Sequence, residues 1–222
     1  MRKEASMSHS LHRCGTVENL QNDYTFYARS SRWVNREGCG PKLRKIFNIM
    51  VSEKVINFGH SEKSLKSGIS LEAYAEGLEN AYGVSGCFSD KNVLKSFLLK
   101  YKAADTGISL VVSGLIDEIV KIAEEIDLKP HTAFLSLGVH GKRALLPEDN
   151  IMEITTMCGH GLVSSRLAAA VMKKVRSGKM TPQEGARFLA QPCPCGIFNT
   201  DRCQALLAQL SDELGADTAS GS

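Results

Sequence analysis

The spacing of four cysteines in the last third of this 222-residue chain constrains its structure more than any other sequence feature. Cys158 is followed after 34 residues by Cys193, a single residue separates Cys193 from Cys195, and seven further residues lead to Cys203. The chain has seven cysteines in total, an odd number, and no apolar export signal follows its basic first residues. A disulfide framework is therefore not expected, and thiols grouped in this way indicate a metal centre.

Two helices are expected between Cys158 and the Cys-Pro-Cys turn, which we define as Cys193–Cys195. Apolar residues recur at helical spacing over residues 163–177, and Thr181-Pro182-Gln183-Glu184 is a capping box with proline at the first position of a second helix. Two antiparallel helices joined by a short loop return the chain to its starting level. The sequence therefore predicts that the Cys-Pro-Cys turn lies close to Cys158.

The residues around the turn suit an anionic metal–thiolate assembly. Pro192 and Pro194 fix the backbone and remove two N–H donors, which holds the two thiols in a stiff arrangement. Gly196 leaves room for the close approach of a bulky inorganic cluster. Cys158 is expected at the N-terminus of the following helix, where the helix dipole lowers the pKa of a thiol. All three features favour thiolates bound to a metal.

Two metals, a redox site and a structural role are the alternatives for this pattern. The favoured interpretation is an iron–sulfur cluster of the [4Fe–4S] type bound by Cys158, Cys193, Cys195 and Cys203. Zinc would instead take His160 in place of Cys203 as a Cys3His set, although zinc ligand pairs are usually two to four residues apart. Cys193 and Cys195 could also form a redox dithiol with Cys158 as partner, or all could be small buried apolar side chains.

The role of Cys203 decides what such a centre can do. As a fourth ligand it would close the cluster, whereas a three-cysteine cluster leaves one iron open to act on substrate as a Lewis acid. Cys203 lies within a predicted helix, three residues before Leu206 on an apolar face, so it is the weakest of the four candidate ligands. His160, two residues after Cys158, is the candidate catalytic acid or base.

The sequence therefore predicts an iron–sulfur protein, either an oxidoreductase, a lyase or a redox subunit, that acts on a small anionic substrate or meets a redox partner protein. The alternative is a non-enzymatic zinc- or cluster-binding module that contacts a partner protein or nucleic acid. Nucleic-acid binding itself is not expected, because the basic run Lys173–Lys179 has no interleaved aromatic residues. No apolar stretch approaches the ~20 residues that span a bilayer, so a cytoplasmic protein without a membrane partner is expected.

The predicted fold class is α/β, with an N-terminal α+β region over residues 1–104. A βαβ unit followed by a helical, cysteine-bearing metal-binding region is expected over residues 105–222. The βαβ unit comprises two apolar strands, Ile108–Val112 and Thr132–Leu137, which should be parallel because a helix connects them.

Other segments and cysteines have weaker signals. Gly83–Gly86 is expected to end a helix, and Ala144–Thr156 is expected to be hairpin-like or extended. Cys14, Cys39 and Cys87 could each contribute to the metal site, but the sequence does not place them in space.

Overall fold

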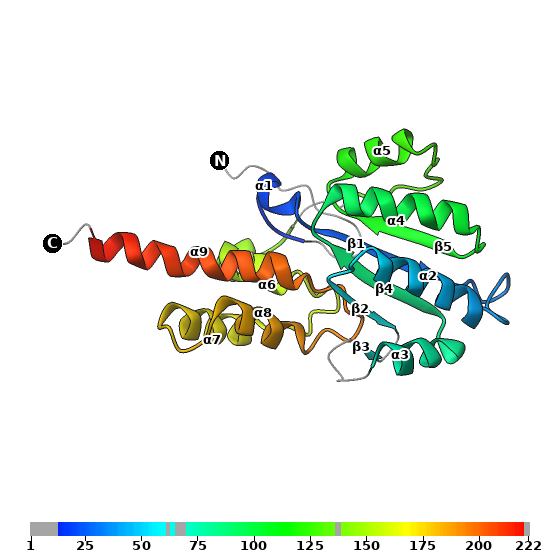
Figure 1. The fold of residues 1–222 in the computed structure, drawn as a ribbon. Helices are drawn as coiled ribbons and strands as arrows, with labels where there is room; N and C mark the ends of the chain where they lie inside the picture. The colour runs from blue at the N-terminus through cyan, green and yellow to red at the C-terminus, as the bar shows by residue number, and fades with distance from the viewer. Residues whose placement is uncertain (1–12, 61–62, 65–69, 136–138, 220–222) are drawn as a thin grey trace.

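The computed structural model describes residues 13–60, 63–64, 70–135 and 139–219 of the chain. They form a sheet region, made of strands and covering helices, and a helical region at one end of the sheet (Figure 1). The sheet region contains α1 (Val17–Leu20), β1 (Tyr24–Arg29), α2 (Gly40–Ser52), β2 (Asn57–His60), β3 (Lys63–Ser64), α3 (Leu71–Gly77), β4 (Gly83–Phe88), α4 (Lys91–Ala104), β5 (Ser109–Ser113) and α5 (Ile116–Glu125). The helical region contains α6 (Asp149–Thr155), α7 (Ser165–Arg176), α8 (Pro182–Ala190) and α9 (Thr200–Ala219).

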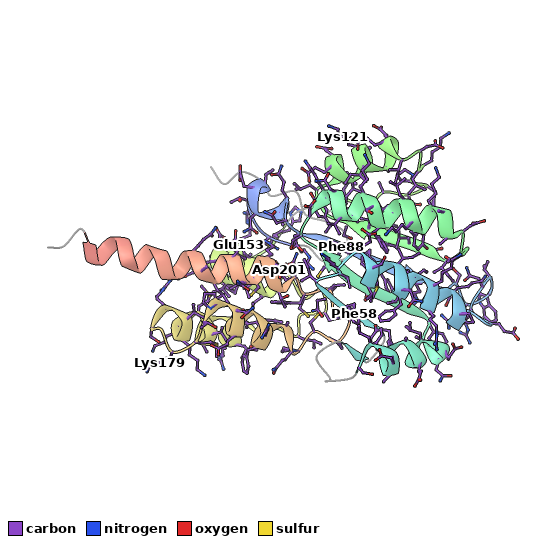
Figure 2. All side chains as sticks on the ribbon, viewed as in Figure 1. Phe58, Phe88, Lys121, Glu153, Lys179 and Asp201 are labelled. Carbon is purple, nitrogen blue, oxygen red and sulfur yellow. The ribbon has the colours of Figure 1, made fainter. Side chains whose placement is uncertain are left out.

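The two faces of the sheet differ in composition. The strand order is β3-β2-β4-β1-β5, and every described pairing is antiparallel. One face is apolar. Its Phe26 packs in a tilted arrangement against Phe97 of α4, and its Phe58 packs edge-to-face against Phe47 of α2. Phe58 and Phe88, labelled in Figure 2, both belong to this layer. Burying each such ring contributes about 1.5–3 kcal/mol, so this face forms the main core.

The opposite face carries small and polar side chains, and we term it the polar face. Since side chains alternate along a strand, its members follow from the register of the paired strands. They are Thr25, Tyr27 and Arg29 on β1, Asn57 and Gly59 on β2, Gly83, Ser85 and Cys87 on β4, and Ser109, Val111 and Ser113 on β5. The helices α2 and α4 do not cover this face, because they pack on the aromatic side.

The strand β4 lies at the centre of the sheet, although its glycines and serine were expected to end a helix. Its glycines are required by close packing: a Cβ on Gly83 would lie 2.6 Å from the carbonyl oxygen of Ala28. A Cβ on Gly86 would lie 2.9 Å from the carbonyl oxygen of Asn57. Residues with low strand propensity therefore form a fully buried strand, because neighbouring strands approach too closely for larger side chains.

The helical region packs α7, α8 and α9 around an aliphatic core, and Glu153, Lys179 and Asp201 mark its extent in Figure 2. The capping box predicted for α8 is present, with the Thr181 hydroxyl accepting from the Glu184 N–H and the Glu184 carboxylate accepting from the Thr181 N–H. The segment expected to be extended before Cys158 instead contains α6. Alternation of polar and apolar residues there fits a short amphipathic helix equally well.

The mixed α/β class with a helical C-terminal region is confirmed. The expected parallel pairing differs, because β5 pairs with β1 in antiparallel orientation at the edge of the sheet. Alternate residues of β5 are exposed, so this strand is not buried on both faces as its apolar sequence indicated. Residues 132–134 form no strand, and residues 136–138 of the expected second strand lie outside the described residues. Within the described ranges, no helix combines the length and the apolarity needed to cross a membrane.

Candidate metal centre

The structure brings four of the predicted site residues together at the junction of the two regions. The Sγ atoms of Cys193 and Cys195 are 3.7 Å apart. The Sγ of Cys195 lies 3.6 Å from Nδ1 of His160. The thiol of Cys158 hydrogen-bonds to Cys193 on the other side. The contacts therefore connect Cys158, Cys193, Cys195 and His160 in a row.

The antiparallel helices α7 and α8 create this meeting, as the sequence indicated. Gly178 has a φ of +67° and reverses the chain after α7, so the end of α8 returns to the level at which α7 began. The α7 helix begins later than expected, however, because its N-cap is Ser164, so Cys158 is not next to its first turn. Cys158 instead follows the C-terminal end of α6, so the predicted lowering of its pKa by a helix N-terminus is wrong.

The Cys-Pro-Cys turn is pressed against the polar face of the sheet. Gly196 has a φ of +66°, and a Cβ at this position would lie 2.0 Å from the carbonyl carbon of Phe58. A Cβ on Gly59 would lie 2.5 Å from the carbonyl carbon of Cys195. The Ser85 hydroxyl donates to the carbonyl oxygen of Cys195 at 2.7 Å. Two glycines and one serine therefore allow backbone-to-backbone packing that fixes the turn on β2 and β4.

A second hydrogen-bonded contact holds the residues that follow the turn. The Asn57 side chain, on β2, donates to the carbonyl oxygen of Phe198 at 3.0 Å. The side-chain NH2 of Asn199 donates to the backbone carbonyl oxygen of Asn22 at 2.9 Å. The side-chain oxygen Oδ1 of Asn199 accepts from the Ser89 hydroxyl at 3.1 Å. These contacts position the beginning of α9 against the sheet, so the turn is fixed from both of its ends.

The three thiols differ in acidity because each donates to the next. The pKa of Cys158 is raised, first by its hydrogen bond to Cys193 and then by burial. Cys158 lowers the pKa of Cys193, but the hydrogen bond to Cys195 and burial outweigh this effect and the net shift is upward. The pKa of Cys195 is lowered, mainly because it accepts from Cys193. Cys195 is therefore the thiol that ionises first.

Backbone N–H groups also reach each sulfur and lower its pKa. They come from Leu162 and His160 for Cys158, from Phe198 for Cys193 and from Ile197 for Cys195. Such donors stabilise negative charge on sulfur without supplying a cation. These donors partly offset the effects that raise the pKa values of Cys158 and Cys193, and they add to the lowering at Cys195.

Cys203 lies apart from this row. Its side chain is fully buried in the helical core beside Leu207, and burial raises its pKa to about 12 against the opposing charge of Arg202. Among the contacts of the described residues, none joins its sulfur to the other three. Its predicted role as a fourth ligand stays a prediction.

The remaining cysteines are now placed. Cys87 is buried on β4 behind the turn. Burial raises the pKa of its thiol, and the charge of Cys193 raises it further. Cys39 donates to the carbonyl oxygen of Ala81 beside α2. The backbone N–H of Cys14 donates to the Thr156 hydroxyl at the end of α6. None of the seven cysteines takes part in a disulfide.

A buried charge node lies beneath the same junction and was not foreseen from the sequence. The Asp23 carboxylate accepts from Arg13 and from Arg202, each at 2.7 Å, and all three side chains are at most 4% exposed. Arg13 also donates to the carbonyl oxygen of Ile197, and Arg202 to that of Cys14. Two segments at opposite ends of the sequence are thereby joined directly behind the cysteine row. No local sequence pattern predicts a contact between residues so far apart in the sequence.

A cavity of about 480 Å³ borders the junction between β2, α8 and α9. Its lining includes Asn57, Arg187, Gln191 and Asp201, so it combines amides with one cation and one anion. Partial burial raises the pKa of the Asp201 carboxyl.

The row geometry has a consequence for metal binding. In the part of the chain that the structure describes, no group of three or more His, Cys, Asp or Glu side chains is placed so that it could hold a metal ion. Comparison with known proteins adds no assignment: no protein-family model, curated protein or solved structure matches this chain. The function is therefore argued from the site alone.

Proposed function

We propose that this chain is a thiolate metal protein in which Cys158, His160, Cys193 and Cys195 bind one tetrahedral ion, with zinc as the favoured metal. The spacing of ligand atoms carries this proposal. Metal–sulfur bonds of about 2.3 Å and metal–nitrogen bonds of about 2.0–2.1 Å, at tetrahedral angles, place two sulfurs about 3.8 Å apart and sulfur and nitrogen about 3.6 Å apart. The corresponding separations are 3.7 Å and 3.6 Å.

The Cys158 side chain completes the set by turning from the end of the row toward the other three ligand atoms. The surroundings favour this arrangement, because backbone N–H groups already reach all three sulfurs. Thiolates bound to different irons of a cluster diverge from one another, whereas thiolates that share one ion stay close. The close pair Cys193 and Cys195 therefore fits a single ion better than the [4Fe–4S] cluster favoured by the sequence.

An iron–sulfur cluster remains the second candidate, supported by a different observation. Hydrogen bonds from backbone N–H groups to cysteine sulfur are one of the means by which proteins tune clusters. Each of the three clustered thiols has such a donor, and Cys203 lies on the next helix. A cluster with three protein ligands would use Cys158, Cys193 and Cys195 and leave His160 beside it.

We propose an enzymatic role on a small anionic substrate, with a non-enzymatic binding module as the alternative. An ion held by all four ligands has no open position, so Lewis-acid polarisation of a substrate oxygen would require His160 to leave the ion. His160 is exposed, whereas Cys158 and Cys193 are buried. The ring of His160 turns Nδ1 toward Cys195, so Nε2 is the atom that can hold or deliver a proton. Reduced thiols in this number suit the cytoplasm, where we place the protein.

Metal and sulfide analysis of anaerobically purified protein tests the proposal. One zinc per chain, no acid-labile sulfide and a colourless solution would support the single-ion centre. Iron with sulfide and a brown colour with absorption near ~400 nm would replace it by the cluster. His160→Ala should weaken zinc binding if histidine is a ligand, and should leave a cluster in place if it is not. Protein that binds neither metal, even when reconstituted with each, would refute both candidates.

A further inference from the structure

The part of the polar face on β1 and β5 is left open next to the cysteine row at Tyr27, Arg29, Ser109 and Val111. The Cys-Pro-Cys turn covers β2 and β4, where it contacts Gly59 and Ser85. Tyr27 on β1 is the direct cross-strand partner of Ser85, and Val111 on β5 is the partner of Tyr27 on its other side. Tyr27 is 38% exposed and Val111 is 44% exposed. The turn is therefore bordered by an accessible floor on the two neighbouring strands.

Arg29 is the only charged side chain that β1, β2, β4 and β5 place on this face. Its cross-strand partners are Gly83 and Ser109, which are too small to cover the guanidinium group. Within the described residues, Arg29 takes part in none of the ion pairs. An arginine on a neutral floor keeps its full capacity to bind an anion through two parallel hydrogen bonds.

Tyr27 holds this guanidinium group in place. Arg29 Nη1 donates to the Tyr27 hydroxyl at 3.1 Å, and its Cζ lies 5.9 Å from the centre of the tyrosine ring. The ring needs a glycine opposite it, because a Cβ on Gly83 would lie 3.0 Å from Tyr27 Cε2. Only some of the five N–H donors of arginine are engaged in this way, so the others face the open floor.

We infer that Arg29, positioned by Tyr27, binds the carboxylate or phosphate group of the substrate whose reacting end lies at the cysteine row. This inference rests on the proposed function for its second half. The register supports it, because Ser85 on β4 is the diagonal neighbour of Arg29 on β1, a separation of about 7–8 Å, and Ser85 itself contacts the Cys195 carbonyl. A molecule anchored at Arg29 therefore needs to extend across one strand and along it by two residues to reach Cys195, which lies next to His160.

Arginine side-chain NMR tests the anion site directly, in zinc-loaded full-length protein and in the metal-free protein. Sodium phosphate and sodium malonate are the two probes, titrated at constant ionic strength. We expect the Nε–Hε resonance of Arg29 to shift saturably with one of them, and that probe identifies the anionic group. Arg29→Gln should raise the Kd of that probe about tenfold or more, and Arg29→Lys should raise it less.

Two controls separate this site from other cationic surfaces. Arg32 lies beyond the end of β1 and stacks on Trp33, with Cζ 4.8 Å from the ring centre. Arg32→Gln should leave the Kd unchanged while removing a charge of the same kind. Arg187 lines the cavity between β2, α8 and α9, and its resonance should not move.

The outcomes distinguish the inference from the proposed function. Zinc binding without any shift of Arg29, or a shift of Arg187 in its place, would overturn the inference while leaving the metal centre intact. A saturable shift of Arg29 in protein that binds no metal would support the anion site and refute the metal centre. Equal affinity of wild type and Arg29→Gln for both probes would also overturn the inference.

Discussion

The cores of the two regions of the molecule differ in the types of side chain that form them. In the sheet region, aromatic rings from strands and helices pack against one another, as Phe26, Phe88 and Phe97 do. In the helical region, the buried side chains are mostly alanine, valine and leucine, with three buried thiols among them. Large rings bury more apolar surface than small aliphatic groups, so each ring contributes more stability. We therefore expect the sheet region to be stabilised mainly by aromatic packing, and the helical region to depend more on its attachment to the sheet and on the metal of the proposed centre.

The largest expected effect tests the attachment between the regions. Asp23→Ala leaves Arg13 and Arg202 buried without a counter-charge, and breaking a buried pair in this way costs about 3–5 kcal/mol. Urea unfolding should show this loss. Glu125→Ala is the control, because it removes a carboxylate from an exposed pair with Lys95 and should change stability little. Equal effects of the two substitutions would contradict the role of the node.

A methyl group at Gly196 should separate the turn from the sheet. Gly196→Ala adds a Cβ that collides with Phe58 and also strains a positive φ, so we expect a loss of about 3 kcal/mol and loss of metal. Gly178→Ala is a matched control with a φ of +67° and no atom within 4 Å of the added Cβ. It should cost only the backbone strain, about 1–2 kcal/mol, and retain metal. Metal content and urea midpoints measure both.

Removal of metal should affect one region and spare the other. Chelation should reduce the hydrogen-exchange protection of α7 and α8, while β1 and β4 keep theirs, because the aromatic core needs no metal. A ligand present at a hundredfold excess over its Kd stabilises by about 2.7 kcal/mol, which sets the scale of the loss. Uniform loss of protection in both regions would show that they unfold as one unit.

The smallest effect concerns Cys203. Cys203→Ala removes a buried sulfur from the helical core and should cost about 1–2 kcal/mol without loss of metal. Cys193→Ala removes a buried sulfur as well, but should abolish metal binding. Parallel metal analysis of the two variants decides whether each cysteine is needed for packing in the core or for binding metal. Loss of metal in Cys203→Ala would restore the four-cysteine set predicted from sequence.

The site was predictable where local signals determine the chain path. The Thr181 capping box and the Gly178 reversal sufficed to bring the Cys-Pro-Cys turn back to Cys158. The start of α7 differs from the prediction because Ser164, and not a residue next to Cys158, caps the helix. The α/β class followed from alternating helix and strand patterns, which are also local.

Features that depend on distant residues were not predictable in the same way. Gly83 and Gly86 have poor strand propensity, and they form the central strand only because Ala28 and Asn57 approach them from other strands. The ion pairs of Asp23 with Arg13 and Arg202 join segments that no sequence pattern relates. Residues 132–134 of the expected second strand form no strand for a related reason, because β5 pairs with β1 and has no parallel neighbour among the described strands.

The buried charge node joins the two ends of the sequence, so it also determines which contacts can form early and which must form late during synthesis. Arg13 and Ile197, whose contact helps to hold the turn, are 184 residues apart. At a translation rate of about 5–20 residues per second, Arg13 and Asp23 leave the ribosome about 10–40 seconds before their C-terminal partners exist. Contacts between residues so far apart in the sequence form last. Cys158 precedes Cys193 by 35 positions, so at the same rate it is synthesised about 2–7 seconds before this partner. Oxidation of the Cys158 sulfur in that interval would block the proposed centre before it forms.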